Sequence, residues 1–306
     1  MDDANACLVT DAHDVHDDAG EALEVIVVHR QQPERCVRTA RSLLAQGVPL
    51  HITVVDNGSS PAAVEELQRD VPEATLVILG ANRGFGPAAN VGLRRWLQDG
   101  RGTWALVAPH DVLLERHCLR RLLAAVEDRP HAGLASAVYG NGGSTKPVVD
   151  RYFGGILVSA ERDVGWEAAG HPHGTLMLAR RACLAQVGLF DERYFAYCEE
   201  ADLGERARRA GWEVGVVWDA VVENPSLSAS TPVVEYLQLR NSLLLVRDHF
   251  GRYPAFIRLT MAIGDTVLRA MAPRRRTPIF SAPARWRAMV DFGRGRFGPP
   301  PGSLAA

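Results

Sequence analysis

Between residues 23 and 107, short apolar runs alternate with amphipathic stretches. The runs are rich in β-branched residues, a composition typical of strands buried in a parallel sheet. They are Leu23–Val28, His51–Val55, Thr75–Leu79 and Trp104–Val107. Apolar residues recur at helical spacing in the stretches between them, which are Pro33–Gln46, Ala62–Arg69 and Pro87–Gln98. This alternation predicts an α/β fold with a mostly parallel central sheet flanked by helices.

The second half of the chain has a less regular pattern. Strands are predicted at Gly174–Leu178 and Glu213–Trp218, and a Gly-rich loop at 139–147. Helices are predicted at Arg180–Val187, Asp202–Ala210 and Val233–Phe250. We therefore expect four parts: a disordered acidic tail over residues 1–22, an α/β domain over 23–232, a helical C-terminal region over 233–272, and a loosely attached Arg- and Pro-rich tail over 273–306.

Charge is unevenly placed along the 306 residues, although the net charge is only −2. The first 24 residues contain eight acids and no Lys or Arg, whereas eleven Arg and three acids follow from Arg247 onward. The overall balance gives no reason to expect a nucleic-acid partner. Two interpretations of the basic end stay open: a solvated surface, or a peripheral contact with anionic lipid or a lipid phosphate.

Cysteine usage and the N-terminus favour a cytoplasmic protein, with the inner face of the membrane as an alternative. The five cysteines form no CxxC pair, which is typical of reduced thiols. The acidic N-terminus does not resemble a signal peptide, and no apolar run approaches the length of a transmembrane helix. The stretch Phe256–Met271 is interrupted by charges, so it would lie on a membrane rather than cross it.

Polar residues follow three of the predicted strands. Asp56, Asn82 and Asp111 each come shortly after a strand, and the carboxyl ends of parallel strands meet at one edge of a sheet, where ligands bind. A carboxylate such as Asp111 is suited to hold a divalent cation that bridges two phosphates. The alternative is that Asp111 caps a helix over Val112–Val126.

Two further segments suggest chemistry. The loop within Asn82–Gly92 (NRGFGPAANVG) opens a helix, and its glycines allow phosphate to approach the backbone, although it is neither a dinucleotide fingerprint nor a P-loop. The segment Gly188–Leu203 (GLFDERYFAYCEEADL) gathers five carboxylates among aromatic residues. Apolar surroundings raise a carboxyl pKa toward the range of a general base. A solvated, acidic start of a helix is the alternative.

The order of these segments resembles the family-2 glycosyltransferases, particularly the rhamnosyltransferase-like branch. The resemblance covers roughly Leu23 to Asn241, and GLFDERYFAYCEEADL is its most specific part. It implies a GT-A nucleotide-sugar-binding fold with a helical C-terminal extension. It also implies an inverting, metal-dependent transfer of a hexose or deoxyhexose, with rhamnose as one candidate, from a UDP- or dTDP-sugar. The acceptor would be a glycan, a lipid-linked intermediate or a small-molecule natural product.

The resemblance also implies roles for particular residues. Glu200 would be the base, paired with Glu199, and Asp111 would hold Mg²⁺ or Mn²⁺. The donor would be contacted by His29, Asp56, Asn82, Arg83, Gly84, Asn90, His110 and Arg240. The sugar and acceptor would be bordered by Gly174, Thr175, Trp166 and Asp202.

Three departures from the family pattern keep an alternative open. Pro109 and His110 precede Asp111 where the family usually has a further acid or amide, Glu200 replaces the usual Asp, and Asn224 replaces a frequent His. These changes favour weak metal dependence, an altered donor, or a catalytically inactive module that still binds nucleotide sugars. The oligomeric state is left open, with a homodimer among the alternatives.

Overall fold

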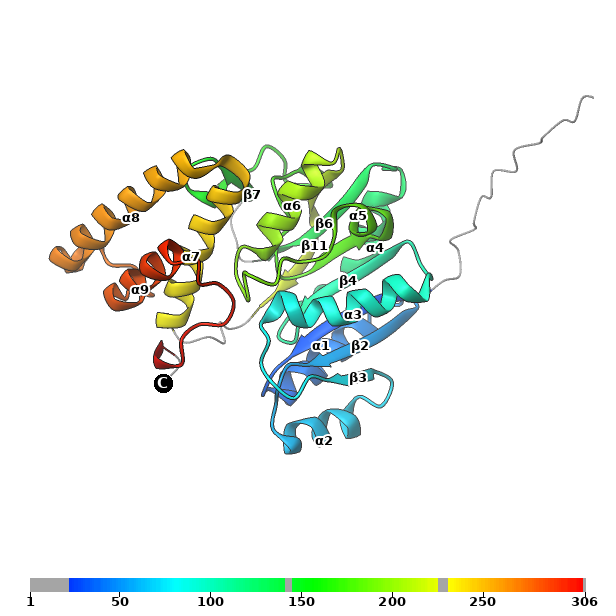
Figure 1. Ribbon diagram of the computed structural model, residues 1–306. Helices are drawn as coiled ribbons and strands as arrows, with labels where there is room; N and C mark the ends of the chain where they lie inside the picture. Colours follow the sequence, from blue (N-terminus) through cyan, green and yellow to red (C-terminus); the bar gives the residue numbers. More distant parts are fainter. Residues whose placement is uncertain (1–21, 141–144, 225–230, 305–306) are drawn as a thin grey trace, which may run out of the picture.

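The computed structural model of the chain describes residues 22–140, 145–224 and 231–304 (Figure 1). Its first half alternates strands and helices as the sequence predicts. The elements are β1 (Leu23–His29), α1 (Pro33–Leu44), β2 (Leu50–Asp56), α2 (Pro61–Asp70), β3 (Thr75–Ile78), α3 (Phe85–Asp99) and β4 (Trp104–Pro109). Each predicted strand and helix here is confirmed to within a few residues.

The elements after β4 are more mixed. They are β5 (Leu113–Leu114), α4 (Cys118–Glu127), β6 (Ala132–Tyr139), β7 (Thr145–Asp150), β8 (Gly154–Ser159), β9 (Trp166–Ala168), β10 (Met177–Arg180), α5 (Arg181–Val187), α6 (Glu199–Arg209) and β11 (Glu213–Glu223). Three helices follow: α7 (Thr231–Phe250), α8 (Arg252–Met271) and α9 (Ala282–Gly293).

One large sheet organises the protein. Its strand order is β3-β2-β1-β4-β10-β6-β11-β5, and β9 also pairs with β11. The first four strands are parallel, and β6 and β11 are parallel to each other. Strand β10 runs antiparallel to both of its neighbours, β4 and β6, and so joins these two parallel groups. The predicted mostly parallel sheet is confirmed.

Helices lie on both faces of the sheet (Figure 1), and alternate residues of a strand point to opposite faces. On β1, Val25 and Val27 pack with residues of α1, α2 and α4, whereas Ile26 and Val28 pack with residues of α3, α5 and α6. Both faces of the sheet are therefore covered. Ligands of such sheets bind beyond the carboxyl ends of the strands, where the loops after β1, β2 and β4 lie.

The C-terminal helices form their own small core, which corrects one prediction. Ala284, Ala288 and Met289 of α9 are buried against Leu239 and Leu243 of α7. The expectation of a loosely attached tail after Pro273 is therefore wrong, because small apolar residues on α9 dock on α7. No helix within the described ranges is long and apolar enough to span a membrane.

Two other predictions need comment. The loop expected over 139–147 is wrong at its ends, since Tyr139 ends β6 and Thr145 begins β7, and 141–144 lie outside the described residues. The disorder expected over residues 1–22 also falls outside them, apart from Ala22.

Candidate active site

The loops after β1, β2 and β4 meet at the carboxyl edge of the sheet. The Nδ1 of His29 lies 3.0 Å from Oδ1 of Asp56, and the rings of His29 and His110 meet edge to face with their centroids 5.3 Å apart. His110 Nδ1 donates to the carbonyl of Val28, at 3.2 Å. Three predicted donor residues are thus neighbours in the structure.

Asp56 is completely buried in this cluster. Its Oδ2 accepts from the backbone N–H of Ser59 at 3.1 Å, while His29 Nε2 accepts from the N–H of Gln32 at 3.1 Å. The remaining ring nitrogen of His29 therefore donates its proton to Asp56. Burial lowers the pKa of His29, which keeps this ring neutral. Asp56 fixes the shape of the loop, and because none of its surface is exposed, a nucleobase would reach its carboxylate only if the loop moved.

Asn57, which sequence reasoning passed over, organises the predicted donor loop. Its Oδ1 accepts from the N–H of Arg83 at 2.8 Å, and its Nδ2 donates to Asn82 Oδ1 and to the carbonyl of Gly84 at 3.1 and 3.0 Å. Asn82 in turn accepts from the N–H of Gly84 at 3.1 Å. The side chain of Arg83 stays exposed, at the N-terminus of α3. This end of the loop is where an anion would be favoured.

Gly84 joins the donor loop to the segment that carries the acids. Its φ is +96°, and a Cβ at this position would lie 2.2 Å from the carbonyl oxygen of Phe195. No other residue fits here without moving the backbone of one of the two loops.

Asn90, a predicted donor contact, is hydrogen-bonded inside the protein. It is 1% exposed, and its amide exchanges two hydrogen bonds with the backbone of Phe190, at 2.9 and 3.0 Å. Its Nδ2 also donates to Glu192 at 3.1 Å. In this structure Asn90 fastens α3 to the acidic segment, and its predicted contact with the donor stays a prediction.

The two predicted catalytic acids begin helix α6. Three residues just before them, Phe195, Tyr197 and Cys198, have φ between +66° and +73°, a conformation that non-glycine residues rarely adopt. The turn delivers Glu199 into the interior, where it is 5% exposed and its Oε2 has no hydrogen-bond partner. Glu200 keeps some exposed surface and lies against Gly174, where a Cβ would be 3.2 Å from Glu200 Oε1.

Burial raises the pKa of both carboxyl groups. The pKa of Glu199 is raised well above its usual value, first by burial and then by the charge of Glu200. The pKa of Glu200 is also raised by burial. The larger rise in pKa belongs to Glu199, so Glu199 is the harder of the two to ionise, and the more accessible Glu200 is better placed to act as a base.

Tyr139, another residue that the sequence did not single out, lies beside the acids. Its hydroxyl is hydrogen-bonded to Thr175 Oγ1, and the His173 ring meets its ring edge to face at 4.3 Å. Burial raises the pKa of Tyr139, the bond from Thr175 opposes this, and the charges of Asp111 and Glu200 raise it further. Asp111 and Glu200 are therefore both within electrostatic reach of one phenol, which brings the predicted metal ligand and base to one site.

Asp111 can hold a metal only with help from a ligand. It is 8% exposed and accepts a hydrogen bond from Asn224 Nδ2 at 3.3 Å. In the described part of the chain no three His, Cys, Asp or Glu residues form a metal-binding group. Mg²⁺ and Mn²⁺ are commonly held by one or two carboxylates, with phosphate and water oxygens completing the shell. The residues present fit that kind of site. The alternative role of Asp111 as a helix cap is wrong, because α4 starts at Cys118 with His117 as its N-cap.

Arg240, predicted near the diphosphate, is fully buried in α7. Its guanidinium donates to Asn241 Oδ1 and to the hydroxyl of Tyr236, at 3.1 and 3.2 Å. The neighbouring Asn241 is also buried, and its Nδ2 lies 2.8 Å from each of three carbonyls, those of Tyr194, Ala196 and Tyr197. The Arg240-Asn241 pair is bonded inside the protein and supports the turn that carries the acids, and the predicted contact of Arg240 with the donor stays a prediction.

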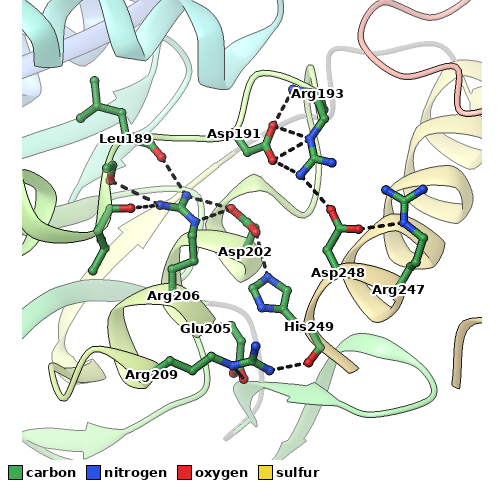
Figure 2. Close-up of polar contacts among 12 residues, drawn as sticks. Leu189, Asp191, Arg193, Asp202, Glu205, Arg206, Arg209, Arg247, Asp248 and His249 are labelled. Atoms are coloured by element: carbon green, nitrogen blue, oxygen red, sulfur yellow. Dashed lines mark hydrogen bonds and ion pairs between the residues drawn. The ribbon is translucent and has the colours of Figure 1, made fainter. Parts of the chain in front are cut away.

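Asp202 is part of a network that ties α6 to α7 (Figure 2). One of its oxygens accepts from Arg206 at 2.8 Å, and the other lies 2.8 Å from His249 Nε2 on α7. Arg206 also donates to carbonyls of the 187–189 segment. With 4% of its surface exposed, Asp202 holds α6 in place and does not face an acceptor.

Trp166 is used in packing as well. Its ring lies on Gly215 of β11, where an added Cβ would be 2.5 Å away, and the Arg129 guanidinium lies 5.1 Å from the ring centroid. These contacts account for the Trp166 ring by packing, and its predicted place beside the sugar and acceptor stays a prediction.

Comparison with known proteins identifies the class. The family model described as Glycosyltransferase like family 2 matches residues 21–242, and the chain belongs to this family. An N-acetylglucosaminyl-diphospho-decaprenol L-rhamnosyltransferase of Mycobacterium tuberculosis is 28% identical, over 82% of this chain and 92% of the relative.

Solved structures agree on the fold. A mannosyltransferase from Pyrobaculum calidifontis in complex with GDP-Man and Mn²⁺ covers 90% of this chain and 87% of its own, with a TM-score of 0.56 and 17% identity. A structure of GalNAc-T7 with UDP, GalNAc and Mn²⁺ covers 89% of this chain and 54% of its own, with a TM-score of 0.61 and 13% identity. The predicted GT-A fold is confirmed. The protein is a glycosyltransferase, and this outcome disfavours the alternative of a catalytically inactive module that only binds nucleotide sugars.

Proposed function

We propose that this enzyme transfers a hexose or deoxyhexose, with rhamnose as the first candidate, from a UDP- or dTDP-sugar to an acceptor hydroxyl with inversion. The observation that carries the proposal is the position of Glu200, which lies against Gly174 and shares the electrostatic neighbourhood of Tyr139 with Asp111. A base and a site for a diphosphate-bound cation on one edge of the sheet are what a single displacement at an anomeric carbon needs.

In this mechanism Glu200 removes the proton of the acceptor hydroxyl. Its raised pKa makes it a stronger base than an ordinary glutamate. Arg83 and the N-terminus of α3 would receive the diphosphate, and Asp111 would hold Mg²⁺ or Mn²⁺ on it. When bound, the cation would offset the charge that develops on the leaving diphosphate. Because one displacement occurs, the anomeric configuration inverts.

The relatives guide the choice of donor and acceptor. The mycobacterial relative is named as a rhamnosyltransferase acting on a decaprenyl-diphosphate-linked sugar. Rhamnose and a lipid-linked acceptor are therefore the first to test, with other glycans and natural products after them.

A donor screen tests the proposed function directly. Purified enzyme is incubated with UDP-, dTDP- and GDP-sugars and Mg²⁺ or Mn²⁺, and release of the nucleoside diphosphate is measured with and without a polyprenyl-diphosphate-linked acceptor. We expect metal-dependent release from a UDP or dTDP donor, dTDP-rhamnose first. Release from GDP-sugars alone, or no release together with no nucleotide binding, would contradict the proposal.

Replacing Asp111 with asparagine is expected to remove the effect of metal on donor binding. In a thermal-shift assay the nucleotide alone should stabilise wild type and variant alike, while the additional gain with Mn²⁺ should be lost in the variant. Ligand stabilisation follows affinity for the folded state, about 2.7 kcal/mol at a hundred times Kd. The exposed Asp99→Asn serves as the control. An unchanged response to Mn²⁺ in Asp111→Asn would remove Asp111 from this role.

The pH dependence follows from the raised pKa of Glu200. The reaction needs the ionised base, so kcat/KM should fall as the pH drops through that pKa. This decline should begin above the ordinary range of a glutamate, about 4.3. Initial rates measured across pH at saturating metal would show it, and a rate that stays flat down to about pH 5 would argue against Glu200 as the base.

A further inference from the structure

Between the two ends of helix α8 the charged residues are Arg258, Asp265 and Arg269, and all three are engaged with the rest of the protein, although the Asp265 side chain stays 38% exposed. Asp265 accepts hydrogen bonds from Arg269 at 2.8 Å and from Arg285 of α9 at 2.9 Å. The Arg258 guanidinium lies 5.6 Å from the ring centroid of Phe153, on the turn between β7 and β8. An ordinary amphipathic helix would turn such residues toward water.

Helix α8 lies at the edge of the molecule (Figure 1), and large apolar side chains are exposed along it. Between residues 253 and 271 the charged residues are only partly exposed, and the exposed large side chains are apolar. The exposed ones are Tyr253, Phe256, Met261, Ile263, Val267, Leu268 and Met271, with exposed fractions from 37% to 80%. We call these residues the α8 face. A helix of this length spans about 30 Å, and apolar patches of this kind mark interaction sites.

Basic residues bracket the α8 face. Arg252 begins the helix, and Arg274 and Arg275 follow its end, all three exposed. The acids nearby are held by arginines of the same unit: Asp265 by Arg285, and Asp291 by Arg287 at 2.7 Å. What the region presents outward is therefore an apolar stripe with positive charge at both ends.

We propose that the α8 face docks this enzyme on the surface of an anionic phospholipid bilayer, with the helix lying in the plane of the interface. Apolar side chains would enter the boundary between headgroups and acyl chains, while Arg252, Arg274 and Arg275 would contact lipid phosphates. The proposal does not depend on the donor or the acceptor.

A second copy of the chain fits this face less well. Two identical faces meeting about a twofold axis would bring arginine against arginine at each end, whether the helices ran parallel or antiparallel. Such like-charge contacts oppose association. An anionic lipid surface satisfies both ends at once.

Vesicle flotation of the full-length enzyme tests the proposal. The vesicles are phosphatidylcholine alone, or phosphatidylcholine and phosphatidylglycerol in equal parts. Wild type should float with the anionic vesicles, bind the neutral ones far less, and detach as ionic strength rises. Replacing both Arg274 and Arg275 with glutamine should weaken binding roughly 25-fold, about fivefold for each arginine.

A matched pair of substitutions separates docking from general effects of an added charge. Val267 and Leu44 are 44% and 40% exposed and both lie on helices, but only Val267 belongs to the α8 face. Val267→Glu should abolish flotation and Leu44→Glu should leave it intact. Both variants should stay folded, because both sites face water.

Three outcomes would overturn the proposal. In the first, the wild type does not bind anionic vesicles. In the second, Val267→Glu and Leu44→Glu float equally. In the third, the wild type binds no vesicles and sediments as a dimer, which Val267→Glu but not Leu44→Glu converts to a monomer. Because binding is measured without turnover, failure here leaves the proposed transfer reaction standing, and failure of the donor screen leaves docking standing.

Discussion

Replacing Glu200 with glutamine is expected to lower kcat by about 10²–10⁴-fold, the usual contribution of a general base. Glutamine keeps the shape of the side chain beside Gly174 but cannot accept the proton of the acceptor hydroxyl. Donor binding should persist, since the proposed donor contacts lie on other loops. Steady-state rates and a nucleotide thermal shift measure the two effects separately. A kcat within tenfold of wild type would move the base elsewhere.

Glu199→Gln is the matched control for this substitution. Burial raises the pKa of Glu199 well above its usual value and so favours the neutral carboxyl, which glutamine imitates. Activity should stay within about tenfold of wild type. Wild type should lose stability as the pH rises from the ordinary glutamate pKa through the raised one, because the folded protein must then ionise a buried carboxyl. Glu199→Gln has no such group, so at alkaline pH the variant should be more stable than wild type. If Glu199→Gln instead loses as much activity as Glu200→Gln, the roles of the two acids are reversed or shared.

Asn241→Ala is expected to lower the free energy of unfolding by about 2–4 kcal/mol and to reduce turnover as well. The substitution removes the side-chain amide nitrogen, which lies 2.8 Å from each of three backbone carbonyls in the turn before α6. Without it, the left-handed residues Phe195 and Tyr197 are freer to relax, at a gain of about 1 kcal/mol each, and the acids that follow them shift. Urea denaturation and kcat/KM measure the two effects.

Gln238→Ala provides the comparison for Asn241→Ala. Gln238 lies one turn earlier on the same helix and is exposed. Its replacement should change stability by less than about 0.5 kcal/mol. Similar losses in the two variants would show that α7 tolerates the missing amide and that the turn is held by other contacts.

The first half of the fold could be predicted because its signals are local. The β-branched runs at β1 and β2 are recognisable as strands from their own residues, and Gly47 and Pro49 mark the end of the helix between them. Strand β6 has no such signal, since its sequence AGLASAVY is rich in small residues. Those residues are explained only by distant partners: a Cβ on Gly133 would lie 2.8 Å from Cys183 and from Trp212. The docking of α9 on α7 is likewise invisible along the chain.

The candidate site shows a similar division. The acidic segment and Asp111 could be singled out from the sequence because ionisable residues beside apolar or strand-forming segments are costly to bury and so often mark functional sites. Asp56, Asn90 and Arg240 are also polar residues in the expected places, yet the structure uses each of them in hydrogen bonds inside the protein. Sequence cannot distinguish a polar group bonded internally from one that awaits a ligand. Tyr139 was missed because it ends a strand that the sequence did not reveal.

The close approach of Gly84 to Phe195 has a consequence for protein engineering. Donor recognition and acceptor activation are often treated as modules that can be exchanged between glycosyltransferases. Here the backbone of Gly84 lies directly against the backbone of Phe195, and there is no room for even a Cβ atom between them. A chimera that takes one of these segments from a relative must take the other with it, so new sugar specificities should be sought by exchanging the two together.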